Sequence, residues 1–221
     1  PQGNRLVGSH DGGWIATASI SHQLTVVNLF SGDLVSLPRI ACACPLPYGA
    51  YNHFYHTRGS IYIKKIIFSR DPSSSNCILA AITKKCNMAL CRIGSPDDHR
   101  RTGSLDGQWT TWGCGTGTNT YTDIAFCNGE LYGFTDSELF KFDITVEEEG
   151  NLVVSQVHTL NIEMTTLYMP EVISIPRYIF ELHGELAITE DVWPESGGRK
   201  AKFIMVFMLA NGGTMWEEVT R

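Results

Sequence analysis

The chain has 221 residues, of which 43% are apolar and 18% are charged, and this composition is typical of a folded domain and excludes a disordered tail. Its formal net charge of −6 gives no support for nucleic-acid binding, and the apolar run at residues 203–210 is far too short to span a membrane. Because the 7 cysteines are odd in number and neither a signal segment nor an Asn-x-Ser/Thr sequon occurs, we expect an intracellular protein, cytoplasmic or nuclear.

Four short strands are predicted within the first 38 residues. Turn-forming residues, such as those at 11–13 and 31–33, separate runs of apolar and β-branched residues. The predicted strands are residues 5–9, 14–18, 23–29 and 34–37. Short strands joined by tight turns predict a small antiparallel sheet.

A second set of strands follows an irregular, aromatic-rich connection at residues 40–59. The predicted strands are residues 61–68, 77–83 and 88–93, and the outer strand is residues 109–112. Ordered loops with exposed aromatic side chains often bind partners, so Tyr48, Tyr51 and Tyr55 are candidate partner-binding residues.

The third set, at residues 121–144, shows the pattern most clearly. Asn128-Gly129 joins two apolar runs, and this dipeptide is the strongest short hairpin signal because both turn positions favour positive φ. Residues 139–144 alternate strictly, which places Phe140 and Phe142 on one face of a strand. Residues 152–160 complete this predicted sheet.

The fourth set repeats the third. Placing Gly129 over Gly184 aligns Ile124 with Ile179 and Leu131 with Leu186, at an offset of 55 residues. It begins near Arg177 and includes residues 203–209 and 215–219. A unit of short strands that recurs without helices predicts an all-β protein, a β-propeller of four-stranded antiparallel blades. We expect residues 1–221 to form a single propeller domain, truncated at both ends, with an incomplete ring of about four blades.

Several segments carry a family resemblance in their order and spacing. They are residues 10–14 (HDGGW), residues 27–32 (VNLFSG) followed by Leu37-Pro38, residues 123–126 with 129–132, and residues 203–216. Together they resemble the plant domain-of-unknown-function 295 family, a β-propeller domain that often follows an F-box. The resemblance implies a propeller that presents protein substrates to a ubiquitin ligase. No F-box precedes the propeller in this sequence, so contact with a ligase adaptor would depend on a segment upstream of it.

The patterns give no support for a cofactor or a metal. The glycine-rich residues 113–117 are followed by a predicted strand, whereas a phosphate-binding loop needs a helix there. The cysteines at positions 42, 44, 77, 86 and 91 lack the C-x₂-C spacing of a structural zinc site and are interpreted as small apolar residues. The histidines are scattered and none has a partner at catalytic spacing.

Two functions remain open at this point. The first is a non-enzymatic protein-interaction module, with Trp193 as a further candidate anchor for an unidentified protein partner. The alternative is a hydrolase acting on a sugar or lactone in the propeller channel, because Glu130 and Glu185 occupy equivalent positions in two blades. We prefer the first, since a glutamate directly after a tight turn is normally solvated.

Overall fold

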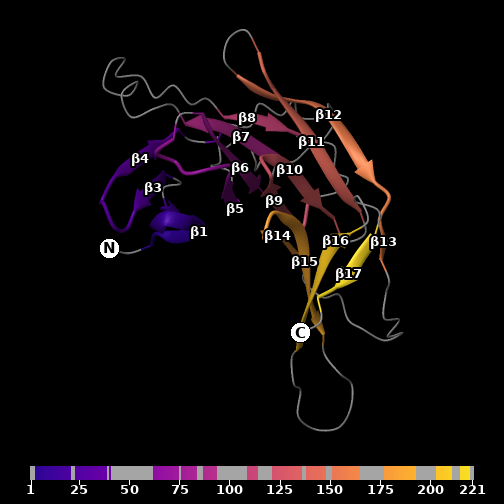
Figure 1. Cartoon of the computed structure of the whole chain (residues 1–221). Helices are drawn as coiled ribbons and strands as arrows, with labels where there is room; N and C mark the ends of the chain where they lie inside the picture. The colour runs from indigo at the N-terminus through magenta and orange to yellow at the C-terminus, as the bar shows by residue number, and fades with distance from the viewer. Residues whose placement is uncertain are drawn as a thin grey trace, which may run out of the picture. The chain divides into compact units, whose positions relative to one another are not determined.

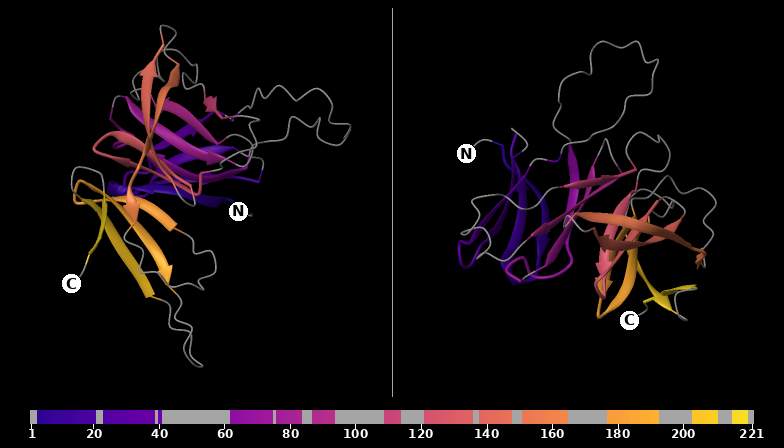
Figure 2. Two further views of the ribbon diagram at one scale, coloured as in Figure 1. Left: turned by 90° about the vertical axis from the view of Figure 1, so that its right-hand side faces the viewer. Right: turned by 90° about the horizontal axis from the view of Figure 1, so that it is seen from above.

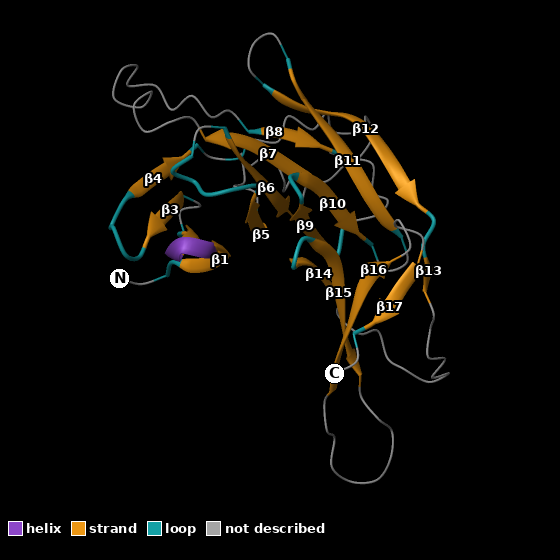
Figure 3. Cartoon of the chain, viewed as in Figure 1, coloured by secondary structure: helices purple, strands orange, loops and turns teal. Residues whose placement is uncertain are grey.

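The structure is a computed structural model, and nearly all of its described secondary structure is β-strand (Figure 3). One 3₁₀ turn, Asp11–Gly13, is the only helical element among the described residues. The described residues are 3–20, 23–38, 40, 62–74, 76–83, 87–93, 109–113, 121–135, 138–147, 151–164, 177–192, 203–210 and 215–219. The strands form four separate sheets, in agreement with the predicted all-β propeller.

The first sheet has the strand order β1-β2-β3-β4, and all its pairs are antiparallel. Its strands are β1 (Arg5–His10), β2 (Trp14–Ala18), β3 (Leu24–Asn28) and β4 (Leu34–Leu37). In β2 and β3 every second residue is buried, so one face of this sheet is covered and the other is partly open. Burial of every second residue is the pattern of a strand that is covered on one face.

The second sheet has the order β5-β6-β7-β8 and the same antiparallel meander. Its strands are β5 (Ile63–Phe68), β6 (Cys77–Thr83), β7 (Met88–Ile93) and β8 (Thr110–Trp112). Strands β6 and β7 are buried along nearly their whole length, on both faces. Their near-continuous apolar sequences are typical of strands covered on both sides.

The third sheet has the order β12-β11-β10-β9. Its strands are β9 (Asp123–Cys127), β10 (Glu130–Phe134), β11 (Leu139–Val146) and β12 (Leu152–Leu160). The Tyr121 ring lies edge-on to both Phe140 and Phe142, at centroid distances of 5.6 and 5.3 Å. The prediction that these two phenylalanines share a face is therefore confirmed.

The fourth sheet differs from the prediction in having five strands. Strands β14 (Arg177–Leu182), β15 (Glu185–Val192), β16 (Phe203–Ala210) and β17 (Met215–Glu218) form the expected antiparallel blade. The additional strand β13 (Glu163–Met164) pairs in parallel with β17. Across all four sheets the predicted strands are confirmed, with ends that differ by no more than about two residues, as expected for strand boundaries.

The chain divides into two compact units, Pro1–Thr120 with Ile144–Ser155, and Tyr121–Asp143 with Gln156–Arg221. In the first unit the sheets β1–β4 and β5–β8, drawn from indigo to magenta in Figure 1, share one apolar core. Trp14, Val26, Leu79 and Cys91 are among its buried members. The inner strands β1 and β5 approach so closely that a Cβ added at Gly8 would collide with the carbonyl oxygen of Ile66.

In the second unit β9 and β10 pack against the fourth sheet, and Figure 2 shows the strands of that sheet from two further sides. The shared core includes Phe134, Ile179, Ile188 and Trp216, each no more than 2% exposed. The buried carboxylate of Asp123 on β9 accepts a hydrogen bond from the backbone N–H of Ile179 on β14, at 3.0 Å. The strand β14 is an edge of its sheet, so this bond satisfies a backbone donor that lacks a strand partner on that side.

Candidate functional site

Three turns of the first unit lie together at one end of its strands. They are the 3₁₀ turn Asp11–Gly13 between β1 and β2, residues 28–33 between β3 and β4, and residues 71–74 between β5 and β6. We call these three turns the hairpin-tip surface. The first two are joined by backbone hydrogen bonding, because the N–H of Leu29 donates to the carbonyl oxygen of Gly13 at 2.9 Å.

Asn28 holds this surface in place. Its side-chain Oδ1 accepts hydrogen bonds from the N–H groups of Phe30 (2.9 Å) and Ser31 (3.0 Å). Its Nδ2 donates to the carbonyl oxygen of Gly12 at 3.1 Å. Asn28 is only 8% exposed, so its amide makes these bonds in a largely dry environment, where they restrict the backbone strongly.

The turn that Asn28 fixes presents apolar side chains to solvent. Phe30 is 85% exposed, and Leu29 and Leu34 in the same hairpin are each 63% exposed. The Phe30 ring lies on the backbone of Gly13, where an added Cβ would stand 2.5 Å from two ring carbons. Gly13 also has φ +84°, a left-handed conformation that favours glycine. One edge of the exposed ring therefore lies beside a backbone position that favours glycine.

Each of the three turns also carries a carboxylate. Asp11, Asp33 and Asp71 are all exposed, one in each of the three turns. Hydrogen bonds from Ser73, and to a smaller extent from Trp14, lower the pKa of the Asp71 carboxyl below its usual value. An oxygen of Asp71 lies 3.8 Å from the position of a Cβ on Gly12, so the charge sits beside the paired glycines.

The second unit has an equivalent pair of turns. Asn128 and Gly129 have φ of 51° and 80°, and His183 and Gly184 have φ of 54° and 83°. The Nδ2 of Asn128 donates to the carbonyl oxygen of Gly184 at 2.7 Å, and the N–H of Asn128 donates to Glu181 at 3.1 Å. The predicted hairpins are confirmed, and their two sheets lie side by side as a repeated blade requires.

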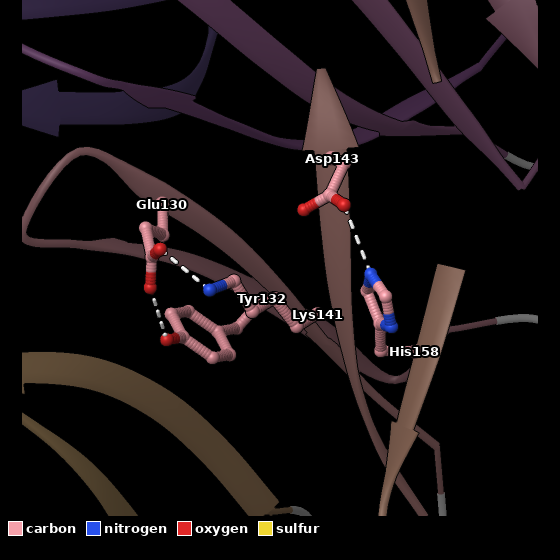
Figure 4. A network of polar contacts seen from close by, with 5 residues as sticks. All are labelled: Glu130, Tyr132, Lys141, Asp143 and His158. Carbon is pink, nitrogen blue, oxygen red and sulfur yellow. Dashed lines mark hydrogen bonds and ion pairs between the residues drawn. The ribbon is translucent and has the colours of Figure 1, made fainter. Parts of the chain in front are cut away.

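A polar network lies on β10 and β11 close to these turns, and Figure 4 shows it. The Glu130 carboxylate accepts bonds from the Lys141 Nζ at 2.5 Å and the Tyr132 hydroxyl at 2.8 Å. The bond from Lys141 has the largest effect and lowers the pKa of Glu130, and the bond from Tyr132 lowers it further. Burial, with a smaller effect of the Glu130 carboxylate, raises the pKa of Tyr132. The Glu130 side chain is thus held as an ionised carboxylate.

A second pair in Figure 4 joins β11 to β12. The His158 Nε2 lies 2.9 Å from the Asp143 Oδ2, and both side chains are less than half exposed, at 40% and 43%. The pair links the edge strand β12 to its neighbour β11.

The described cysteines are free and buried. Burial raises the pKa of Cys77 to about 11, of Cys91 to about 12 and of Cys127 to about 11. A thiol with so high a pKa is protonated at neutral pH and is a poor nucleophile and a poor metal ligand. Within the described ranges, no three His, Cys, Asp or Glu side chains are grouped as a metal site would need.

Several predicted site residues cannot be placed. Tyr48, Tyr51, Tyr55 and Trp193 lie outside the described residues, as do most of the glycine-rich loop and Cys42, Cys44 and Cys86. Glu130 and Glu185 directly follow equivalent turns, as the repeat predicts, and both are exposed. The sequence pattern does not predict the hairpin-tip surface, because it extends the third strand to Leu29 whereas β3 ends at Asn28. The available signal was the polar turn chemistry at Asn28, Ser31 and Gly32, which leaves the intervening Phe30 outside the sheet.

Antiparallel four-stranded sheets that recur along the chain and pack face to face in pairs define a β-propeller. The comparison with family models agrees with this class. The chain belongs to the KIB1-4 β-propeller family, whose model matches residues 1–221. A search of curated proteins finds no match. No helix in the described part of the chain has the length and apolar character of a membrane span.

Proposed function

We propose that this chain is a non-enzymatic protein-interaction module. The observation that carries the proposal is Phe30, which is 85% exposed on a turn whose backbone Asn28 holds by hydrogen bonds. A turn that is already ordered loses little backbone entropy on binding, and exposed aromatic rings are common binding hot spots. Membership of a β-propeller family supports the same function, since propellers display loops on a stable scaffold.

We further propose that the partner is a protein substrate of a ubiquitin ligase and that the module acts inside the cell. This rests on the sequence resemblance to propellers that follow an F-box. It treats residues 1–221 as a single propeller domain, in which the adaptor is contacted by an F-box and the substrate by the propeller. The chain itself would then supply recognition, not chemistry.

The hydrolase alternative has weaker support. A glycosidase acid must be protonated at neutral pH, which requires a raised pKa. Bonds from Lys141 and Tyr132 shift the pKa of Glu130 in the opposite direction. We therefore favour recognition over hydrolysis. A turnover of sugar or lactone substrates that Glu130→Gln abolishes would reverse this preference.

Co-purification from cell extract tests the proposal. Two baits are used: the 221-residue chain, and the product of the whole reading frame that encodes it. We expect both to retain a common substrate protein, and the longer bait to retain a cullin-ligase adaptor if that frame encodes an F-box. Ile20→Ala is the matched control for Phe30→Ala in both baits. Ile20 is also apolar and 73% exposed, but it lies in the turn between β2 and β3, outside the hairpin-tip surface. Retention of no specific protein by either bait would refute the proposal.

A further inference from the structure

We infer that the hairpin-tip surface binds a short segment of a partner protein in which an apolar residue is flanked by Lys or Arg. The inference rests on the proposed interaction function and names the chemistry of its partner. It follows from the apolar group at Leu29 and Phe30 and from the carboxylates in all three turns.

The apolar part of the surface is preformed. One edge of the Phe30 ring lies beside the backbone of Gly13, where an added Cβ would stand 2.5 Å from two ring carbons, and 85% of the residue faces solvent. Leu29 is adjacent, and its N–H bond to Gly13 keeps it in the same turn. An aliphatic or aromatic side chain of a partner would bury apolar area here without any ordering of the turn, which keeps the entropic cost of binding low.

The charged part of the surface selects the flanking residues. The three turns carry the carboxylates of Asp11, Asp33 and Asp71, and Arg70 and His10 directly precede two of these turns in the sequence. The Asp33 carboxylate accepts a hydrogen bond from the Ser31 hydroxyl at 2.5 Å. The lowered pKa of Asp71 keeps its carboxylate charged at neutral pH.

The excess of carboxylates in these turns attracts Lys or Arg and disfavours an acidic segment. The same charges disfavour the phosphate backbone of a nucleic acid as the occupant. The surface is formed by exposed turns, so an extended or loosely structured peptide segment reaches it without insertion between sheets. A short segment with an apolar residue and flanking basic residues can contact the Phe30 ring and pair with the carboxylates of the three turns.

A peptide selection on the intact 221-residue chain tests this inference. A displayed library of random peptides of about 12 residues is selected for binding, and single enriched peptides are then measured by fluorescence polarisation. We expect enriched peptides to share an apolar residue with Lys or Arg on either side. Phe30→Ala is expected to weaken their binding by about tenfold or more.

The charge term is tested separately. Asp11→Asn combined with Asp33→Asn retains side-chain size and hydrogen-bonding capacity, and we expect it to weaken binding roughly threefold to tenfold and to reduce its salt dependence. Ile20→Ala and Glu138→Gln, an exposed apolar and an exposed acidic residue elsewhere, should leave binding unchanged. Thermal melting of each variant separates loss of binding from loss of folding.

Three results would overturn the inference: no enriched peptide, enrichment of acidic peptides, or binding that Phe30→Ala leaves intact in a folded protein. These outcomes are distinct from failure of the proposed function. If the co-purification recovers a specific protein and Phe30→Ala retains it, the chain is an interaction module that uses another surface. If the selection succeeds but no cellular protein is recovered, the peptide-binding chemistry of the surface stands and the proposed function falls.

Discussion

Removal of the Asp123 carboxylate is expected to weaken the packing of β9 against β14. Asp123 is 2% exposed, and its Oδ2 accepts the backbone N–H of Ile179 at 3.0 Å. In Asp123→Ala this N–H loses its acceptor at a position that water does not reach. In Asp123→Asn an amide oxygen of the same size can still accept the bond.

The magnitude follows from these two effects. A hydrogen bond to a charged group contributes about 1.5–3 kcal/mol, and a buried N–H left without a partner costs about 1–3 kcal/mol. The two figures overlap, because both describe the same N–H, so we expect Asp123→Ala to lower the free energy of unfolding by about 3 kcal/mol. For a chain of this size the melting temperature should fall by roughly 6–12 °C. Asp123→Asn should cost only about 1 kcal/mol.

Urea unfolding followed by tryptophan fluorescence measures the global effect, since Trp216 is buried in the core of the same unit. Hydrogen exchange provides the local readout: in Asp123→Ala the amide of Ile179 should exchange much faster, while that of Ile188 on the neighbouring strand β15 changes little. If residues 1–221 form a single domain, the urea curve should show one transition. Equal stability of Asp123→Ala and Asp123→Asn, or an unchanged Ile179 exchange rate, would refute this account of the β9–β14 contact.

Three further predictions concern the first unit. Gly8→Val should lower the free energy of unfolding by about 2 kcal/mol or more, because its Cβ collides with the Ile66 carbonyl and β1 must move from β5; an unchanged urea midpoint would contradict this. Cys91, whose pKa burial raises to about 12, should react with iodoacetamide far more slowly in the native protein than in urea, and equal rates by peptide mapping would show an accessible thiol. Because bonds from Ser73 lower the pKa of Asp71 in the folded state, its carboxylate stabilises the fold above the unfolded-state pKa and loses this effect as the pH falls through the folded-state pKa. The difference in free energy of unfolding between the parent chain and Asp71→Asn should therefore decrease as the pH falls below 3.8, the ordinary pKa of an aspartate. An increase of this difference in acid would contradict a lowered pKa for Asp71.

The blades were predictable from the sequence because their signals are local. Asn128-Gly129 specifies a turn through its own backbone preferences, and positive φ at both residues confirms it. The repeat at Gly184 then identified a second blade without knowledge of any long-range contact. Alternation at residues 139–144 likewise placed Phe140 and Phe142 on one face, where both contact Tyr121, since the side-chain period of a strand is fixed.

The features that sequence reasoning missed depend on long-range contacts. The strand β13 has two residues, too few for any periodic pattern, and it pairs in parallel with β17, which lies far along the chain. The sequence indicates the turn after Asn28 through Ser31 and Gly32, but it does not indicate the exposure of Phe30. A phenylalanine beside a strand is usually buried, and the bond from Asn28 to Gly12 of another hairpin is a contact that the local sequence does not specify.

The side-chain contacts of Asn28 and Asn128 limit which substitutions in these turns can test binding without disturbing the fold. In the first unit Asn28 links neighbouring hairpins of one sheet, and in the second unit Asn128 links hairpins of two sheets. In both cases the asparagine Nδ2 donates to a backbone carbonyl oxygen. Replacement of either asparagine should therefore lower the stability of the fold, so a loss of binding in such a variant would not identify a binding surface. Phe30 contributes only its backbone N–H to these bonds, and its side chain is not part of them. Substitution of its side chain therefore separates recognition from stability, and a Phe30→Ala protein that melts like the parent is the condition under which a loss of binding identifies the surface.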